Sequence, residues 1–171
     1  MRKIRVEKIT LNIGAGKDEE KLKRGIALLK KITGVEPQKT MTRKRIPTWG
    51  LRPGLTIGCK FTLRGKAAEE LLRRLLEAAG NKLHAGQFDR EGNFSFGIVE
   101  YIDIPGVSYD PDLKMMGLEV SVTLGRAGFH VKRRKVRSHK IPARHRTTPA
   151  DVMQFMQERF QTRMVQEEAS S

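Results

Sequence analysis

The chain has 171 residues, with 34 Lys or Arg against 19 Asp or Glu, which gives a formal net charge of +15. This length fits one domain with its own hydrophobic core. Its single cysteine, Cys59, excludes an intrachain disulfide, and no apolar run approaches the roughly 20 residues needed to cross a bilayer. The first residues also lack the apolar core of a signal peptide, so we expect a soluble, cytoplasmic protein without a membrane partner.

The positive charge is concentrated in two stretches that contain no acidic residue. The first basic window, residues 37–68, has eight Lys or Arg, and the second basic window, residues 126–149, has nine. The rest of the chain therefore holds 17 basic and 19 acidic residues and is nearly neutral. A generally basic, heat-tolerant protein would intersperse acids among its cations. We instead expect a partner with dense negative charge.

The first half of the chain predicts strands on either side of a helix. Apolar and polar residues alternate over 8–13, as in a half-buried strand, and an apolar stripe at helical spacing follows over 17–33. Gly34 is suited to end that helix. Residues 38–45, rich in Thr and cations, predict a second strand, and the Pro and Gly residues of 46–55 predict a loop.

The strongest alternation in the sequence lies over 56–64 and predicts a strand, followed by an amphipathic helix over 66–79. Residues 81–93 are expected to form a polar loop, and 94–103 and 118–124 to form two further strands.

The chain is expected to end in a helix after a basic loop over residues 126–147. Thr148 suits the N-cap, Pro149 the first helical position, and Asp151 the first turn. Residues 166–171 are expected to form a frayed tail.

Strands outnumber helices and do not alternate regularly with them. We therefore predict an α+β fold, with helices packed on one face of a mostly antiparallel sheet and the other face exposed for RNA. Residues 1–165 would form a single RNA-binding domain.

The uncovered face is expected to display Asn12, Lys60, Thr62 and Arg64, next to the strand over 38–45. Arg and Lys neutralise phosphates, whereas Asn and Thr reach ribose hydroxyls or base edges. Trp49, in the nearby loop, either stacks on an unpaired base or closes the core, and composition favours neither.

Patterns for catalysis or cofactor binding are incomplete. Around Gly14–Lys17, Leu11 and Asp18 occupy the places where a phosphate-binding loop needs Gly and Ser or Thr. The histidines of the second basic window have no neighbouring carboxylate or cysteine, so no metal or cofactor site is expected. Cys59 alternates with core residues and is interpreted as a buried hydrophobic residue. We thus predict a binding protein, not an enzyme. The alternative is a DNA-binding protein, but the cations lie on strands and loops, not on a recognition helix.

In this order the segments resemble the L-five family of large-subunit ribosomal proteins, which binds 5S ribosomal RNA. The segments that carry the resemblance are Ile9–Gly14, Lys31–Gly34 with Pro37, Thr42–Lys44, Leu51–Gly54, Ile57–Gly65, Gly92–Ile98, Tyr109–Pro111 and Gly117–Val120. Residues 124–146 resemble the archaeal and eukaryotic branch of the family. Val35 departs from the polar residue common in the family after the Thr-Gly turn.

The resemblance implies a structural protein that anchors 5S rRNA in the central protuberance of the cytoplasmic ribosome. Its implied partners are 5S rRNA, large-subunit rRNA, peptidyl-site tRNA, small-subunit protein S-thirteen and neighbouring large-subunit proteins. The positions implied to bind RNA are Asn12, Thr40, Arg43, Lys44, Arg45, Trp49, Arg52, Lys60, Thr62 and Arg64. A loop implied to approach the tRNA has Asn81, Lys82, His84, Arg90 and Asn93. Charge alone suggests further RNA contact for the basic loop, through Arg126, Lys132, Arg133, Arg134, Lys135, Arg137, Lys140, Arg144 and Arg146.

Overall fold

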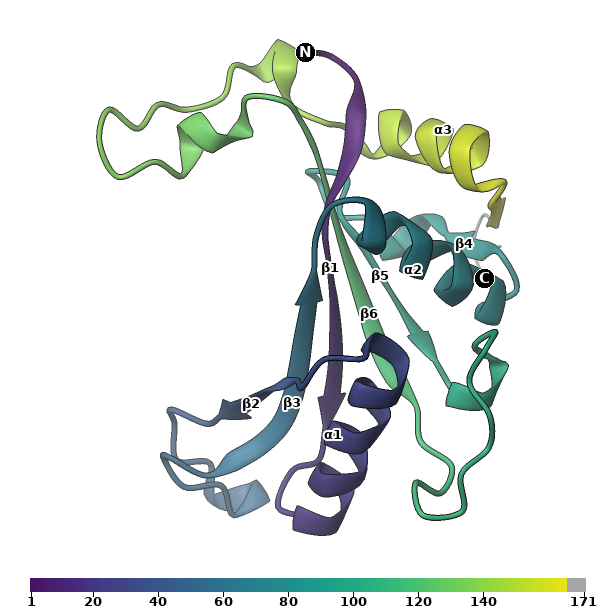
Figure 1. The fold of residues 1–171 in the computed structure, drawn as a ribbon. Helices are drawn as coiled ribbons and strands as arrows, with labels where there is room; N and C mark the ends of the chain where they lie inside the picture. The colour runs from purple at the N-terminus through teal and green to yellow at the C-terminus, as the bar shows by residue number, and fades with distance from the viewer. Residues whose placement is uncertain (166–171) are drawn as a thin grey trace, which may run out of the picture.

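Five antiparallel strands form the main sheet, in the spatial order β2-β3-β1-β6-β5 (Figure 1). The computed structural model describes residues 1–165. The strands are β1 (Ile4–Gly14), β2 (Gln38–Met41), β3 (Thr56–Leu63), β5 (Phe94–Ile98) and β6 (Leu118–Arg126). The two longest, β1 and β6, lie side by side, and this pairing places the N-terminus against a segment more than a hundred residues later.

One face of this sheet is apolar because the strands alternate with a period of two residues. In β6, Leu118, Val120 and Val122 are buried, whereas Glu119 and Ser121 between them are exposed. The same alternation in β1 turns Ile9, Leu11 and Ile13 to the apolar side. These residues belong to one hydrophobic cluster that extends from Val6 to Phe160. The main-sheet prediction is thus confirmed, as is the α+β class.

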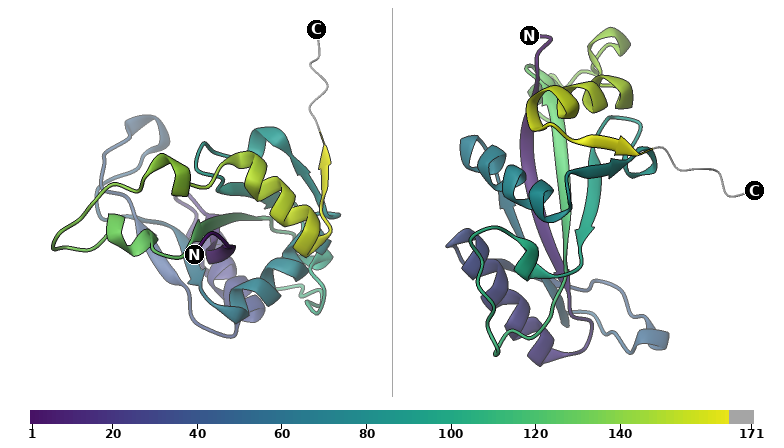
Figure 2. Two further views of the ribbon diagram at one scale, coloured as in Figure 1. Left: turned by 90° about the horizontal axis from the view of Figure 1, so that it is seen from above. Right: turned by 90° about the vertical axis from the view of Figure 1, so that its right-hand side faces the viewer.

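Two helices, α1 (Glu19–Thr33) and α2 (Lys66–Ala78), cover the apolar face and lie on the same side of the sheet (Figure 2). The Asp18 side chain caps α1 by accepting from the backbone N–H of Lys21 at 3.0 Å. The helix ends at Gly34, which has a φ of 74°, a conformation that favours glycine. Both helices bury leucines against the sheet, which leaves the opposite face free of helices α1 and α2.

The third helix, α3 (Pro149–Phe160), begins as the sequence predicts. The Thr148 hydroxyl accepts from the Asp151 N–H at 3.3 Å, and the Asp151 carboxylate in turn accepts from the Thr148 N–H. The helix lies across the end of the sheet and is joined to α2 by an ion pair between Arg159 and Glu69 (2.6 Å).

The expectation of a plain loop over 81–93 is wrong in part. Residues Lys82–His84 form β4, which pairs in parallel with β7 (Arg163–Val165). Within β4, Leu83 is fully buried between two exposed residues. A strand of three residues is too short to be recognised from its alternation in the sequence. The predicted frayed tail, residues 166–171, lies outside the described residues.

Two predicted strands are shorter than expected. β2 ends at Met41 because the next residue, Thr42, starts a turn in which its hydroxyl donates to the Lys44 carbonyl at 2.9 Å. β5 ends at Ile98, ahead of a 3-10 turn at Tyr101–Asp103. Within residues 1–165, no helix combines the length and the apolar character that a membrane crossing requires.

Candidate RNA-binding surface

The sheet face opposite α1 and α2, here called the open face, brings the predicted polar residues together. Asn12 stands opposite Lys60 and Thr10 opposite Thr62 in the β1–β3 register, and Thr40 of β2 stands opposite Gly58. The hydroxyls of Thr10 and Thr62 lie 3.4 Å apart. Lys60 and Thr62 are exposed, and so is Arg64, directly after β3. Alternation in the sequence predicts Asn12, Lys60, Thr62 and Arg64 on this face, and the structure adds Thr10.

The open face also carries an acidic residue. Glu119 of β6 stands opposite Asn12, whose side-chain N–H₂ donates to the Glu119 carboxylate at 3.3 Å. One acceptor position of Glu119 is therefore occupied, and the Asn12 amide is oriented by the protein before any ligand arrives. The same alternation that places Asn12 on this face would have placed Glu119 there, had the β1–β6 pairing been known.

The first basic window contains no ion-paired cation among the residues that the structure describes. Seven of its eight Lys and Arg residues lie on the open face, at the start of α2 or in the segment between β2 and β3, and Lys39 lies in β2 opposite the buried Cys59. None of the eight is within salt-bridge distance of a described carboxylate. Like charges gathered without compensation are unfavourable in the free protein. The window therefore has its full charge available for an anionic partner.

The segment 42–55 between β2 and β3 is ordered by its own backbone. Ile46 and Leu51 exchange two hydrogen bonds of 3.0 Å, and Thr42 N–H donates to the Leu55 carbonyl at 2.9 Å. Trp49 sits at the tip of this segment with 66% of its surface exposed. The structure thus decides between the two interpretations of Trp49: the ring is not part of the core. The four cations of the segment, also exposed, are Arg43, Lys44, Arg45 and Arg52.

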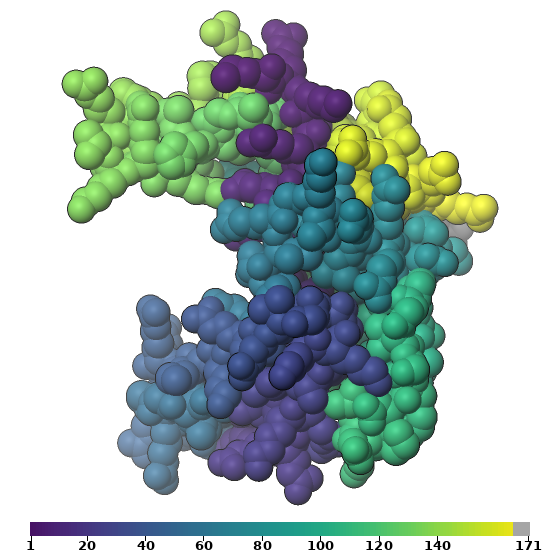
Figure 3. Space-filling model, in the orientation of Figure 1, coloured from purple at the N-terminus to yellow at the C-terminus, as the bar shows by residue number. Residues whose placement is uncertain are grey.

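The second basic window forms an arm, residues 127–147, that projects from the end of the sheet (Figures 1 and 3). In the space-filling view the arm and the segment 42–55 project toward the same side of the molecule, with a recess between them. The two basic windows are separated by more than fifty residues in the sequence, yet both lie on this side of the protein.

Three of the nine cations in this window are paired with acids from outside it, so the charge of the window is partly compensated within the protein. Lys132 lies 2.9 Å from Glu91, Arg133 pairs with Glu7, and Arg126 lies 2.9 Å from Asp151. The Arg126 side chain is only 13% exposed, so little of its charge is presented at the surface. The other six cations of the second basic window have no ion pair among residues 1–165; they are Arg134, Lys135, Arg137, Lys140, Arg144 and Arg146.

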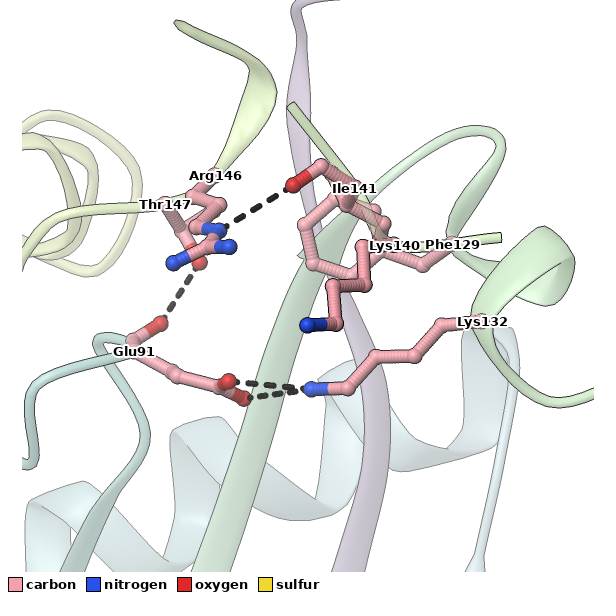
Figure 4. A pocket seen from close by; sticks show the side chains of 7 residues that line it. All are labelled: Glu91, Phe129, Lys132, Lys140, Ile141, Arg146 and Thr147. Carbon is pink, nitrogen blue, oxygen red and sulfur yellow. Dashed lines mark hydrogen bonds and ion pairs between the residues drawn. The ribbon is translucent and has the colours of Figure 1, made fainter. Parts of the chain in front are cut away.

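A cavity of about 150 Å³ marks where the arm is attached to the body (Figure 4). Glu91 binds both ends of the arm there: its carboxylate accepts from Lys132, and its carbonyl accepts from the Thr147 hydroxyl at 2.5 Å. The Arg146 Nε–H donates to the Ile141 carbonyl at 3.2 Å and so stabilises the part of the arm that returns to the body. These contacts position the arm without using its exposed outer cations, Lys135, Arg137, Lys140 and Arg144.

The segment 81–93 lies by β5, at the sheet edge opposite β2. Lys82, His84 and Arg90 are exposed. Asn93 instead holds the segment together, because its side chain donates to Asp89 at 2.7 Å and accepts from the Leu124 N–H at 3.2 Å. The Asn81 carbonyl accepts from the Arg163 N–H at 2.7 Å and so joins β4 to β7.

The single cysteine of the chain does not reach the surface. Cys59 of β3 is fully buried beneath α1, and burial raises the pKa of its thiol to about 11. No cluster of three or more His, Cys, Asp or Glu within the described residues could hold a metal ion. What the surface offers is charge, hydroxyls, amides and one exposed indole, the groups with which proteins bind nucleic acid.

Two family models match the chain over most of its length. Residues 1–52 match the model for ribosomal protein L5, and residues 56–155 match the model for the C-terminus of the same ribosomal protein family. Among curated proteins, the chain is similar to the large ribosomal subunit protein uL5 of Sulfurisphaera tokodaii, with 45% identity across 97% of this chain and 94% of the relative.

Other archaeal relatives agree. The uL5 protein of Nanoarchaeum equitans is 46% identical across 96% of this chain and 98% of the relative, and that of Methanobrevibacter smithii is 38% identical across 98% of each. These relatives are ribosomal proteins and not enzymes, in agreement with the prediction from the sequence. The chain belongs to the ribosomal protein L5 family.

Proposed function

We propose that this protein is a structural constituent of the large ribosomal subunit, in the cytoplasm, that binds 5S rRNA through the open face and the segment 42–55. The observation that carries the proposal is the first basic window, in which eight cations have no ion pair among the described residues. Phosphates would neutralise Lys60 and Arg64, Asn12 and Thr62 would reach ribose or base edges, and Trp49 would stack on an unpaired base.

The finer assignments extend this proposal to other surfaces, with residues 1–165 acting as one RNA-binding unit. The outer cations of the arm would contact large-subunit rRNA, because they lie exposed on a projecting segment. The segment 81–93 would approach the peptidyl-site tRNA through Lys82, His84 and Arg90. Its location at the sheet edge opposite β2 supports a partner different from the one bound by 42–55. Contacts with small-subunit protein S-thirteen and neighbouring large-subunit proteins belong to the same proposal.

A triple substitution of the open face tests the central claim. Lys60→Ala, Thr62→Ala and Arg64→Ala together remove two cations and a hydroxyl from an exposed surface, so the fold should be retained. Because each phosphate contact releases counterions, the slope of log affinity for 5S rRNA against log salt should fall by about 2. A matched control, Lys21→Ala with Lys23→Ala, removes two exposed cations from α1 and should leave the slope unchanged.

Equal affinity and slope for the triple variant and the wild type, at physiological salt, would rule out the open face as the binding surface. A competition between structured RNA and duplex DNA for the wild-type protein separates the RNA-scaffold role from the alternative of DNA binding. Preference for duplex DNA would support that alternative.

A further inference from the structure

A second pocket, of about 480 Å³, lies where the arm meets the end of the open face. Its walls come from three parts of the chain that are distant in sequence: Arg5 and Glu7 from β1, Arg64 after β3, and Phe129, His130 and Arg133 from the arm. The pocket therefore lies at the junction of the two basic windows. Arg5 belongs to neither window and is not among the positions predicted to bind RNA.

A glycine of the sheet lets two side chains of the pocket pack closely against the backbone. Gly125 of β6 stands opposite Arg5, and a Cβ atom at Gly125 would lie 3.3 Å from the Phe129 ring and 3.5 Å from the Glu7 carboxylate. The ring and the carboxylate thus sit over this glycine. An irregularity in β1, where the register with β6 shifts between Val6 and Lys8, accommodates Glu7 as an extra residue.

Glu7 orients Arg133 toward the pocket. The two side chains form a double hydrogen bond, in which Arg133 Nη1 and Nη2 donate to Oε1 and Oε2 of Glu7, the second at 3.3 Å. A guanidinium has five N–H donors in a rigid fork, so this pair leaves donors of Arg133 for another acceptor. About half of the Arg133 side chain remains exposed.

The balance of charge in the pocket is positive. Arg5 and Arg64 have no ion pair among residues 1–165, and the single carboxylate of Glu7 is matched by Arg133. Arg126 also lines the pocket, but its charge is compensated by Asp151. Two uncompensated guanidinium groups beside a third that is held in place suit a phosphate, which arginine binds through paired N–H donors.

We propose that this pocket binds a backbone phosphate of the RNA and so joins the two basic windows into one continuous site. The inference rests on the proposed function and extends it to residues outside the first window. Arg64 follows Thr62 by two residues, roughly 6.6 Å along an extended chain, so the same RNA strand that crosses the open face reaches the pocket. There it contacts Arg133, which belongs to the second window.

Single substitutions test whether the pocket is occupied. For the full-length protein binding 5S rRNA, Arg5→Ala should lower the slope of log affinity against log salt by about 1, and Lys60→Ala on the open face should do the same. Lys23→Ala, an exposed cation on α1, should have no effect. Each variant is first compared with the wild type by thermal unfolding, and Arg5→Gln replaces Arg5→Ala if the latter is unfolded.

The outcomes separate this inference from the proposed function. An unchanged slope for Arg5→Ala together with a reduced slope for Lys60→Ala overturns the pocket and leaves the open face as the binding surface. Unchanged slopes for both overturn the proposed function itself.

A double-mutant cycle tests whether the pocket joins the windows. If Arg64 and Arg133 hold the same phosphate, the loss of affinity in the Arg64→Ala/Arg133→Ala double variant should be clearly smaller than the product of the two single losses. Losses that multiply would show that the two arginines bind independently and would overturn the claim of one continuous site.

Discussion

The guanidinium of Arg126, the last residue of β6, lies 2.9 Å from the carboxylate of Asp151 in the first turn of α3. These two residues flank the arm, so their ion pair ties its two ends to the body of the protein. Asp151 also completes the capping interaction with Thr148. One carboxylate therefore takes part in the cap of α3 and fixes the base of the basic arm.

Replacing this carboxylate should destabilise the protein. Asp151→Ala would remove the cap contact and leave Arg126, largely buried, without its partner. Because Asp151 itself is 43% exposed, we expect a cost of about 1–2 kcal/mol, between the values typical of exposed and buried pairs. Urea denaturation measures it, with Glu70→Ala, an exposed acid on α2, as the control. Equal stability of the two variants would contradict the role assigned to the pair.

Trp49 is expected to matter for binding and not for folding. Since 66% of its surface is exposed, Trp49→Ala should change the free energy of unfolding by no more than about 0.5 kcal/mol. Loss of stacking on a base should weaken 5S rRNA binding by about 1–3 kcal/mol, and Trp49→Phe should retain part of the affinity. Trp49 is the single tryptophan, so its fluorescence reports directly on the contact. Emission unchanged by saturating RNA would argue against stacking.

The Cys59 thiol should be inert in the folded protein. Burial raises its pKa from 9.0 to about 11, which lowers the thiolate fraction at neutral pH by about 100-fold. A thiol-specific reagent should therefore label the native protein at least about 100-fold more slowly than the protein in denaturant. Similar rates in the two conditions would mean that the packing of α1 against β3 around Cys59 opens readily.

The start of α1 should be sensitive to acid. The backbone N–H of Lys21 donates to the Asp18 carboxylate and lowers the pKa of that group below its usual 3.8. A carboxyl with a lowered pKa in the folded state stabilises that state above pH 3.8 and loses the effect as the pH falls through its folded-state pKa.

We therefore expect Asp18→Ala to be less stable than the wild type at neutral pH, with the difference shrinking below pH 3.8. Asp18→Asn, which caps without titrating, serves as the control, and the unfolding midpoints of the three proteins as a function of pH provide the measurement. A difference between wild type and Asp18→Ala that stays constant down to about pH 2 would contradict this account.

Much of the fold could be predicted because the local signals are strong. The alternation over 56–64 and 118–124 marks strands with one apolar face, and the Gly34 and Thr148 signals mark helix ends within a residue or two. The pairing of β4 with β7 could not be predicted. Each is three residues long, and they lie about eighty residues apart, so the stability of either comes from its partner and from the burial of Leu83.

The residues of the candidate site likewise include some that could be predicted from the sequence and some that could not. The grouping of Asn12, Lys60 and Thr62 followed from alternation within strands, but Arg5 entered the site only through the position of the arm.

The positions of the cations along the chain, and the absence of acids from two stretches, are properties of the sequence alone. Which of those cations keep their charge depends on how the chain folds. Glu7, Glu91 and Asp151 are 126, 41 and 25 residues from the side chains they bind, yet they neutralise Arg133, Lys132 and Arg126. The attraction between two charges depends on their separation in space and on the surrounding solvent, not on their separation along the chain. In the folded protein the charge of the first basic window is thus uncompensated among the described residues, whereas ion pairs attach the second basic window to the body.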